Sequence, residues 1–80
     1  MVALDWHGLG RRVASARALL GWTQEELALQ ADTSQRTVSQ VEQGRYKQLA
    51  VPILVGLSEA LNITLPYLVY GHDPRPPRGA

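Results

Sequence analysis

The chain has 80 residues, of which 45% are hydrophobic and 19% charged, and its formal net charge is +1 with a pI near 8.2. This length allows one domain, and the apolar share is typical of a globular protein rather than a disordered one. Because the sequence contains no cysteine, disulfides and thiolate metal sites are excluded. The weak positive charge does not by itself indicate a nucleic-acid partner.

The hydropathy pattern indicates a cytoplasmic protein. Residues 1–10 lack the basic start and the apolar run of a signal peptide. No stretch approaches the roughly 18 apolar residues that a membrane span needs. We therefore expect a cytoplasmic chain with no membrane partner.

The first helix is predicted by apolar residues that recur with helical spacing. Gly21 is placed to end this helix, because glycine readily adopts the left-handed conformation just past a helix end. Two glycines, Gly8 and Gly10, leave the start open, and Asp5 is a candidate N-cap. The apolar stripe consists of Leu9, Val13, Ala16 and Leu20.

Two shorter helices are expected next, over residues 24–31 and 35–43. Thr23 and Glu26 have the spacing of a capping box, in which each side chain accepts a hydrogen bond from the backbone of the other residue. Ser34 is a favourable N-cap for the second of these helices. The sequence thus predicts two short capped helices separated by a brief turn.

Two further helices complete the predicted domain. One is expected over residues 51–61, and a last short helix begins after Thr64 and ends at Gly71. Residues 72–80 contain three of the five prolines and no apolar periodicity, which predicts a flexible tail. We therefore expect an all-α domain over residues 1–71.

The two short helices have the arrangement of a helix-turn-helix motif. A helix that enters the major groove needs exposed side chains that donate and accept hydrogen bonds. Glutamine can pair with adenine at two points, and arginine can do so with guanine. The N-terminus of the first short helix can point backbone N–H groups at a phosphate. The polar face of the second short helix consists of Gln35, Arg36, Ser39 and Gln40.

Leu9 to Gly71 resembles the Cro/phage-repressor (Xre-type) helix-turn-helix family. The resemblance is carried by Arg17, by TQEELA from residue 23, by SQRTVSQVEQG from residue 34 and by GLSEALNITLPYLVYG from residue 56. It implies a five-helix, lambda-repressor-like fold that acts as a homodimer on a palindromic site in double-stranded DNA. The implied function is transcription regulation, most simply repression.

The resemblance also assigns roles to individual residues. Arg17 and Glu42 match a pair that forms an ion pair beneath the motif. The base-contacting positions correspond to Gln35, Arg36, Ser39 and Gln40. We expect contacts to DNA phosphates from Thr23, Gln24, Thr37, Arg45 and Lys47.

The sequence departs from the family pattern at two places. The family usually has glycine in the turn between the two short helices, where this chain has Asp32. Aspartate tolerates the left-handed conformation, so the turn should be kept, but its negative charge does not favour DNA. The loop over residues 45–50 is longer than usual in the family.

The C-terminal half carries more apolar and aromatic side chains than two helical stripes require. Such an excess marks either a protein interface or the covering of a small core. We favour a homodimer interface, formed by Val55, Leu65, Tyr67 and Tyr70.

The same residues leave other functions open. A protein-interaction module that has lost DNA binding is favoured by the low net charge and by Asp32. Among regulators, a phage or plasmid repressor, a restriction-system controller and the antitoxin of a toxin pair remain open. A toxin or RNA polymerase would then be a protein partner.

An enzyme is not expected, because no set of residues supports catalysis. Gly8 and Gly10 lack the preceding strand and the third glycine of a nucleotide-binding loop. His7 and His72 have no carboxylate cluster around them. We therefore expect no metal and no cofactor.

Overall fold

The computed structural model describes residues 5–46 and 49–72, and these residues form five helices without a strand. This arrangement confirms the all-α class predicted from the sequence. The helices are α1 (Trp6–Leu19), α2 (Gln24–Gln30), α3 (Gln35–Glu42), α4 (Val51–Leu61) and α5 (Leu65–Tyr70).

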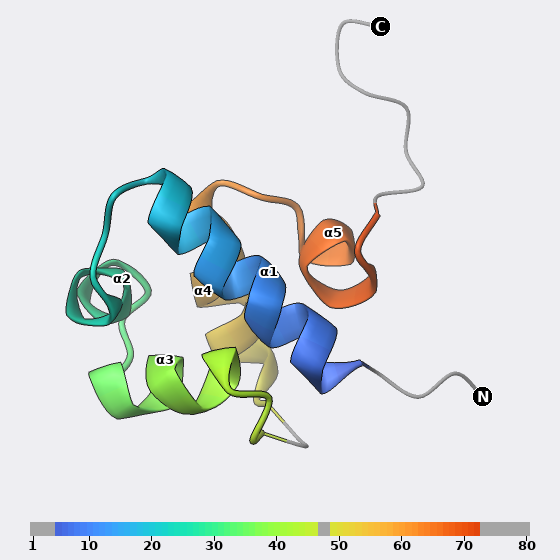
Figure 1. The fold of residues 1–80 in the computed structure, drawn as a ribbon, viewed down its shortest axis with the longest axis horizontal. Helices are drawn as coiled ribbons and strands as arrows, with labels where there is room; N and C mark the ends of the chain where they lie inside the picture. Colours follow the sequence, from blue (N-terminus) through green and yellow to red (C-terminus); the bar gives the residue numbers. More distant parts are fainter. Residues whose placement is uncertain (1–4, 47–48, 73–80) are drawn as a thin grey trace, which may run out of the picture.

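The first helix runs through the middle of the domain (Figure 1). In this view α2 and α3 lie on one side of α1, α5 lies on the other, and α4 lies behind it. Helix α1 packs against α3, α4 and α5, while α4 also contacts α2 and α5. The helix-turn-helix pair is therefore held on a base made by the other three helices.

A single core joins all five helices. Trp6 and Trp22 are half-buried and pack against its edge. Because the core side chains come from every helix, the position of α3 depends on the whole domain. The core consists of Leu9, Val13, Leu27, Ala28, Ala31, Val38, Val41, Leu57, Leu61 and Leu68.

Helix α1 begins at Trp6, three residues before the first member of the predicted stripe. Asp5 is its N-cap, as proposed from the sequence, and the Asp5 Oδ1 atom accepts a hydrogen bond of 3.0 Å from the backbone N–H of Gly8. Gly8 and Gly10 lie inside the helix and are buried. The cap and the tertiary packing thus override the low helix propensity of glycine.

The expected inward position of Leu20 is wrong. Leu20 is the C-cap of α1, not a member of its last turn, and its side chain is 46% exposed. The stripe ends because the chain leaves the helix at Leu19 and turns at Gly21, whose φ is 72°.

The remaining helix ends lie close to those predicted. Helices α2 and α3 each end one residue early, at Gln30 and Glu42. Helix α4 has the predicted bounds, and its N-cap residue, Ala50, makes no side-chain capping hydrogen bond. Thr64 caps α5 by accepting a hydrogen bond of 3.2 Å from the N–H of Tyr67.

Two further points concern the end of α4 and the C-terminal tail. Asn62 ends α4 in the left-handed conformation, with a φ of 56°, a helix end that was not predicted from the sequence. Within the predicted tail, residues 73–80 lie outside the described part of the chain.

Candidate nucleic-acid interface

Helices α2 and α3 are joined by residues 31–34, which make the turn of a helix-turn-helix unit. Asp32 adopts the left-handed conformation with a φ of 56°, as predicted for a residue standing where the family has glycine. The N–H of Thr33 then donates a hydrogen bond of 2.9 Å to the carbonyl oxygen of Ala28. The turn is thereby closed on the last part of α2.

Both helices of the unit are capped as the sequence predicts. The hydroxyl of Thr23 accepts a hydrogen bond of 3.1 Å from the N–H of Glu26, and a carboxylate oxygen of Glu26 accepts one of 3.0 Å from the N–H of Thr23. The hydroxyl of Ser34 accepts a hydrogen bond of 3.1 Å from the N–H of Thr37. These caps fix the start of each helix.

The inner faces of the two helices hold α3 in a fixed direction. Leu27 and Val38 have fully buried side chains, and Ala28 and Val41 are also buried. Because these residues belong to the common core, the opposite face of α3 is directed away from the domain.

The four predicted base-contacting residues lie on α3. Gln35 and Arg36 are exposed, and Ser39 and Gln40 are half-buried. The hydroxyl oxygen of Ser39 accepts a hydrogen bond of 3.0 Å from the side-chain amide of Gln43, which leaves the Ser39 O–H free to donate. The surface of α3 thus offers both donors and acceptors.

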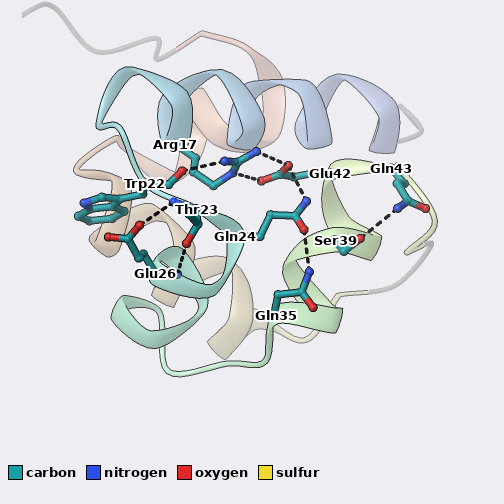
Figure 2. A network of polar contacts seen from close by, with 9 residues as sticks. All are labelled: Arg17, Trp22, Thr23, Gln24, Glu26, Gln35, Ser39, Glu42 and Gln43. Carbon is teal, nitrogen blue, oxygen red and sulfur yellow. Dashed lines mark hydrogen bonds and ion pairs between the residues drawn. The ribbon is translucent and has the colours of Figure 1, made fainter.

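An ion pair lies beneath this surface. The Nε and Nη2 atoms of Arg17 donate to the two carboxylate oxygens of Glu42 at 2.7 and 3.0 Å, and Nη1 donates to the carbonyl oxygen of Trp22 at 2.8 Å (Figure 2). The hydrogen bond to Glu42 raises the pKa of Arg17 above its usual value, despite partial burial. Arg17 therefore joins α1 to α3 and to the chain entering α2.

Gln24, at the start of α2, connects the ion pair to the exposed face of α3. Its Nε2 atom donates to Glu42 at 3.1 Å, and its Oε1 atom accepts from the side-chain amide of Gln35 at 2.8 Å (Figure 2). No sequence pattern predicts these contacts. Their separations of 18 and 11 residues belong to no local motif, so only the fold reveals them.

Four of the five residues predicted to contact phosphates lie in the part of the chain that the structure describes. Thr23, Gln24 and Thr37 lie at the first turns of α2 and α3, and Arg45 is exposed in the loop after α3. Lys47 lies outside the described residues.

The predicted dimer residues lie on α4 and α5. The side chains of Tyr67 and Tyr70 are 43% and 63% exposed, respectively. Leu65 and Val55 are half-buried, and Leu65 packs against the core. The tyrosines are therefore the accessible part of this set.

Helix α5 is fixed to α1 by the side chain of Arg12. Its Nε atom donates to the carbonyl oxygen of Leu68 at 2.9 Å, and its Nη2 atom donates to that of Val69 at 3.0 Å. These carbonyls belong to the last turn of α5, where a positive charge is favourable. Arg12 thus has a structural role.

The chain matches the family model described as Helix-turn-helix over residues 13–68. It belongs to the Xre-type helix-turn-helix family. The match covers α2, α3 and α4, the second half of α1 and most of α5. A comparison with curated protein sequences finds no significant match.

Solved structures of this family have the same fold. The restriction-modification controller protein C.AhdI from Aeromonas hydrophila is 28% identical, with a TM-score of 0.74 over 80% of this chain and 96% of that one. The c2 repressor of P22, in complex with a synthetic operator, is 28% identical, with a TM-score of 0.75 and the same two coverages. The N-terminal DNA-binding domain of SinR from Bacillus subtilis is 24% identical, with a TM-score of 0.73 over 78% and 90% of the two chains.

These similarities confirm the lambda-repressor-like fold class and the family that the sequence resembles. The chain is a DNA-binding transcriptional regulator of the Xre type. Within residues 5–46 and 49–72, no helix has the length and apolar character needed to cross a membrane.

Proposed function

We propose that the protein binds a palindromic operator as a homodimer and represses transcription by occupying it. The observation that carries this proposal is the exposed polar face of α3, beside the capped start of α2. Two such faces related by a two-fold axis would enter successive major grooves about 34 Å apart. The regulatory effect would then come from occupying DNA, without catalysis.

The base contacts are assigned to four side chains of α3. Arg36 is exposed and would donate two hydrogen bonds to a guanine, the commonest specific contact in the major groove. Gln35 would pair with an adenine through its amide. Ser39 and Gln40, one turn further along, would contact the next bases.

The phosphate contacts are assigned to the ends of the two helices. Because the capping box occupies the N–H groups of Thr23 and Glu26, those of Gln24 and Glu25 remain available to a phosphate. The hydroxyl oxygen of Thr37 accepts a hydrogen bond of 2.9 Å from Ser34, so its own O–H can donate to a second phosphate. The hollow beside these groups is lined by Arg17, Thr23, Gln24, Glu25 and Gln35.

Two basic side chains would add phosphate contacts from the loop after α3. Arg45 is exposed, so its guanidinium is free to approach the backbone of the duplex. Lys47, two residues further along the sequence, would have the same role. These contacts would contribute affinity that falls as salt rises, without a preference for sequence.

The homodimer is assigned to the surface that carries Tyr67 and Tyr70. Exposed tyrosines are favourable in protein interfaces, because each adds a large apolar area and a polar end. Leu65 and Val55 would border this surface. Arg12 holds α5 to α1, so the two recognition helices would keep a fixed separation.

A selection from random-sequence duplexes tests the proposal. The purified protein is mixed with the library at about 150 mM salt, and the retained duplexes are sequenced. We expect enrichment of a two-fold symmetric site whose half-sites lie about one helical turn apart. Weak, salt-sensitive binding without any enriched sequence would contradict the proposal and favour a protein-interaction module.

A further inference from the structure

Four side chains from three helices form a continuous chain of hydrogen bonds that ends on the recognition surface. Arg17 donates to Glu42, Glu42 accepts from Gln24 at 3.1 Å, and Gln24 accepts from Gln35 at 2.8 Å (Figure 2). The Glu42 end is nearly enclosed, with a side chain only 8% exposed, whereas Gln35 is exposed. A buried charge thus lies two hydrogen bonds away from a predicted base-contacting residue.

The chemistry of Glu42 fixes the direction of every amide in this chain. An ionised carboxylate only accepts hydrogen bonds, and both of its oxygens also accept from Arg17. The Gln24 atom that faces Glu42 must therefore be its nitrogen, which leaves its oxygen facing Gln35. Because that oxygen needs a donor, Gln35 turns its own nitrogen toward Gln24, as Figure 2 shows.

We propose that Glu42 is a positioning residue for base recognition: through Gln24, its carboxylate sets which end of the Gln35 amide is offered to DNA. This inference rests on the proposed function of α3. Gln35 is left with a free carbonyl oxygen and one free N–H group. This pattern matches the amino group and the N7 atom of adenine.

The opposite orientation of the Gln35 amide would reject the same base. If the amide were turned by 180° in the same docked position, its nitrogen would face the adenine amino group and its oxygen would face N7. Donor would then meet donor and acceptor would meet acceptor. The charge of Glu42 therefore selects for adenine at a distance, beyond its role in the ion pair.

The test compares three substitutions in the random-duplex selection. Glu42→Gln is close in shape but offers an N–H group as well as an oxygen, so the Gln24 and Gln35 amides are no longer held in one orientation. Gln24→Ala removes the connection while leaving both partners of the ion pair. Gln30→Ala, a change of an exposed glutamine in the same helix, is the matched control.

The wild-type protein and Gln30→Ala should enrich the same site. Glu42→Gln and Gln24→Ala should lose the preference for adenine at one position of each half-site by about 5- to 150-fold, with the other positions unchanged. An unchanged adenine preference in both variants would overturn the inference. A wild-type protein that enriches no site would instead contradict the proposed function itself.

A second measurement separates positioning from plain support of the fold. In the free wild-type protein, the side-chain NH2 signals of Gln24 and Gln35 should be displaced from those of exposed Gln30 in a nitrogen–proton correlation spectrum. In Glu42→Gln both displaced signals should move toward the Gln30 position while the backbone signals of the core stay in place. The positioning role is wrong if the Gln35 signal does not move. It is also wrong if the signals of Gln24 and Gln35 change only to the extent that the protein unfolds.

Discussion

Gly10 in α1 and the backbone of Val41 in α3 approach each other so closely that no side chain fits between them. A Cβ atom at position 10 would collide with the carbonyl oxygens of Val41 and Glu42. The opposing atoms belong to the backbone, so neither can move aside without shifting α3. The place of the recognition helix on α1 therefore depends on the absence of a side chain at this residue.

Gly10→Ala should destabilise the protein although alanine is the better helix former. Forced separation of packed helices costs about 1–3 kcal/mol, whereas alanine gains at most about 1 kcal/mol of helix propensity, so we expect a net loss of up to about 2 kcal/mol. Denaturant unfolding measures the difference. Ser15→Ala, at an exposed site of the same helix, is the control and should be neutral or slightly stabilising. A clear gain in stability for Gly10→Ala would show that α1 and α3 are not in close contact.

Arg17→Met should lower the free energy of unfolding by about 3 kcal/mol, because it leaves the nearly buried carboxylate of Glu42 without its cationic partner. Thermal or denaturant unfolding checks this value. Arg11→Met removes the same charge from an exposed site of the same helix and should change stability little. Equal losses in the two variants would mean that the ion pair has no special role in the fold.

The boundaries of the helices could be predicted largely from local chemistry. The capping box of Thr23 and Glu26 predicts the start of α2, and the tolerance of aspartate for the left-handed conformation predicts the turn at Asp32. Capping and turn formation can be predicted because they depend on neighbours within a few residues. The start of α1 does not follow from local chemistry in the same way, because Gly8 and Gly10 are poor helix formers outside their tertiary setting. Packing against α3 supplies the missing reason for Gly10.

The candidate site could be predicted as a set of residues but not as a network. The residues of α3 follow from the polar face of one helix, and the pairing of Arg17 with Glu42 came from family resemblance. The link from Glu42 through Gln24 to Gln35 depends on how three helices meet, and a linear pattern does not encode it. Its consequence for base preference therefore emerges only from the structure.

Asp5→Ala should destabilise the protein at neutral pH and less so in acid. The hydrogen bond from the N–H of Gly8, with the nearby charges of Arg11, Arg12 and His7, lowers the pKa of Asp5 below 3.8. A lowered folded pKa means that the contribution is complete above pH 3.8 and is lost as pH falls through the lower folded value. Unfolding of both proteins at pH 7 and at about pH 2 measures this change. A difference that stays constant with pH would contradict the capping role.

Arg36→Ala and Arg45→Ala should weaken DNA binding in different ways. Arg36→Ala should reduce affinity for the selected site by about 1–3 kcal/mol and relax preference at one base step. Arg45→Ala should weaken selected and scrambled duplexes alike and reduce the salt slope by about one. Titrations of both duplexes at several salt concentrations distinguish the two. A uniform loss for Arg36→Ala would reassign that side chain to phosphate.

Tyr70→Glu should shift the protein toward monomers. The tyrosine side chain is 63% exposed on the proposed dimer surface, and its replacement puts a negative charge into that surface. Sedimentation at micromolar concentrations measures the change, with a dimer expected for the wild type. Leu29→Glu alters an apolar side chain on α2 that is even more exposed, at 78%, and should leave the dimer intact. A wild-type monomer, or an equal effect of both substitutions, would argue against this interface.

Operator binding in the proposed manner requires two copies of α3 to enter successive major grooves on one side of the duplex. Chemical methylation of guanine N7, which lies in the major groove, tests this most directly on the selected operator. For the wild-type protein we predict two protected patches whose centres lie about 10–10.5 base pairs apart. In the Arg36→Ala variant, the guanine that Arg36 contacts should be less protected. A single protected patch, or no major-groove protection under conditions of full binding, would contradict the account.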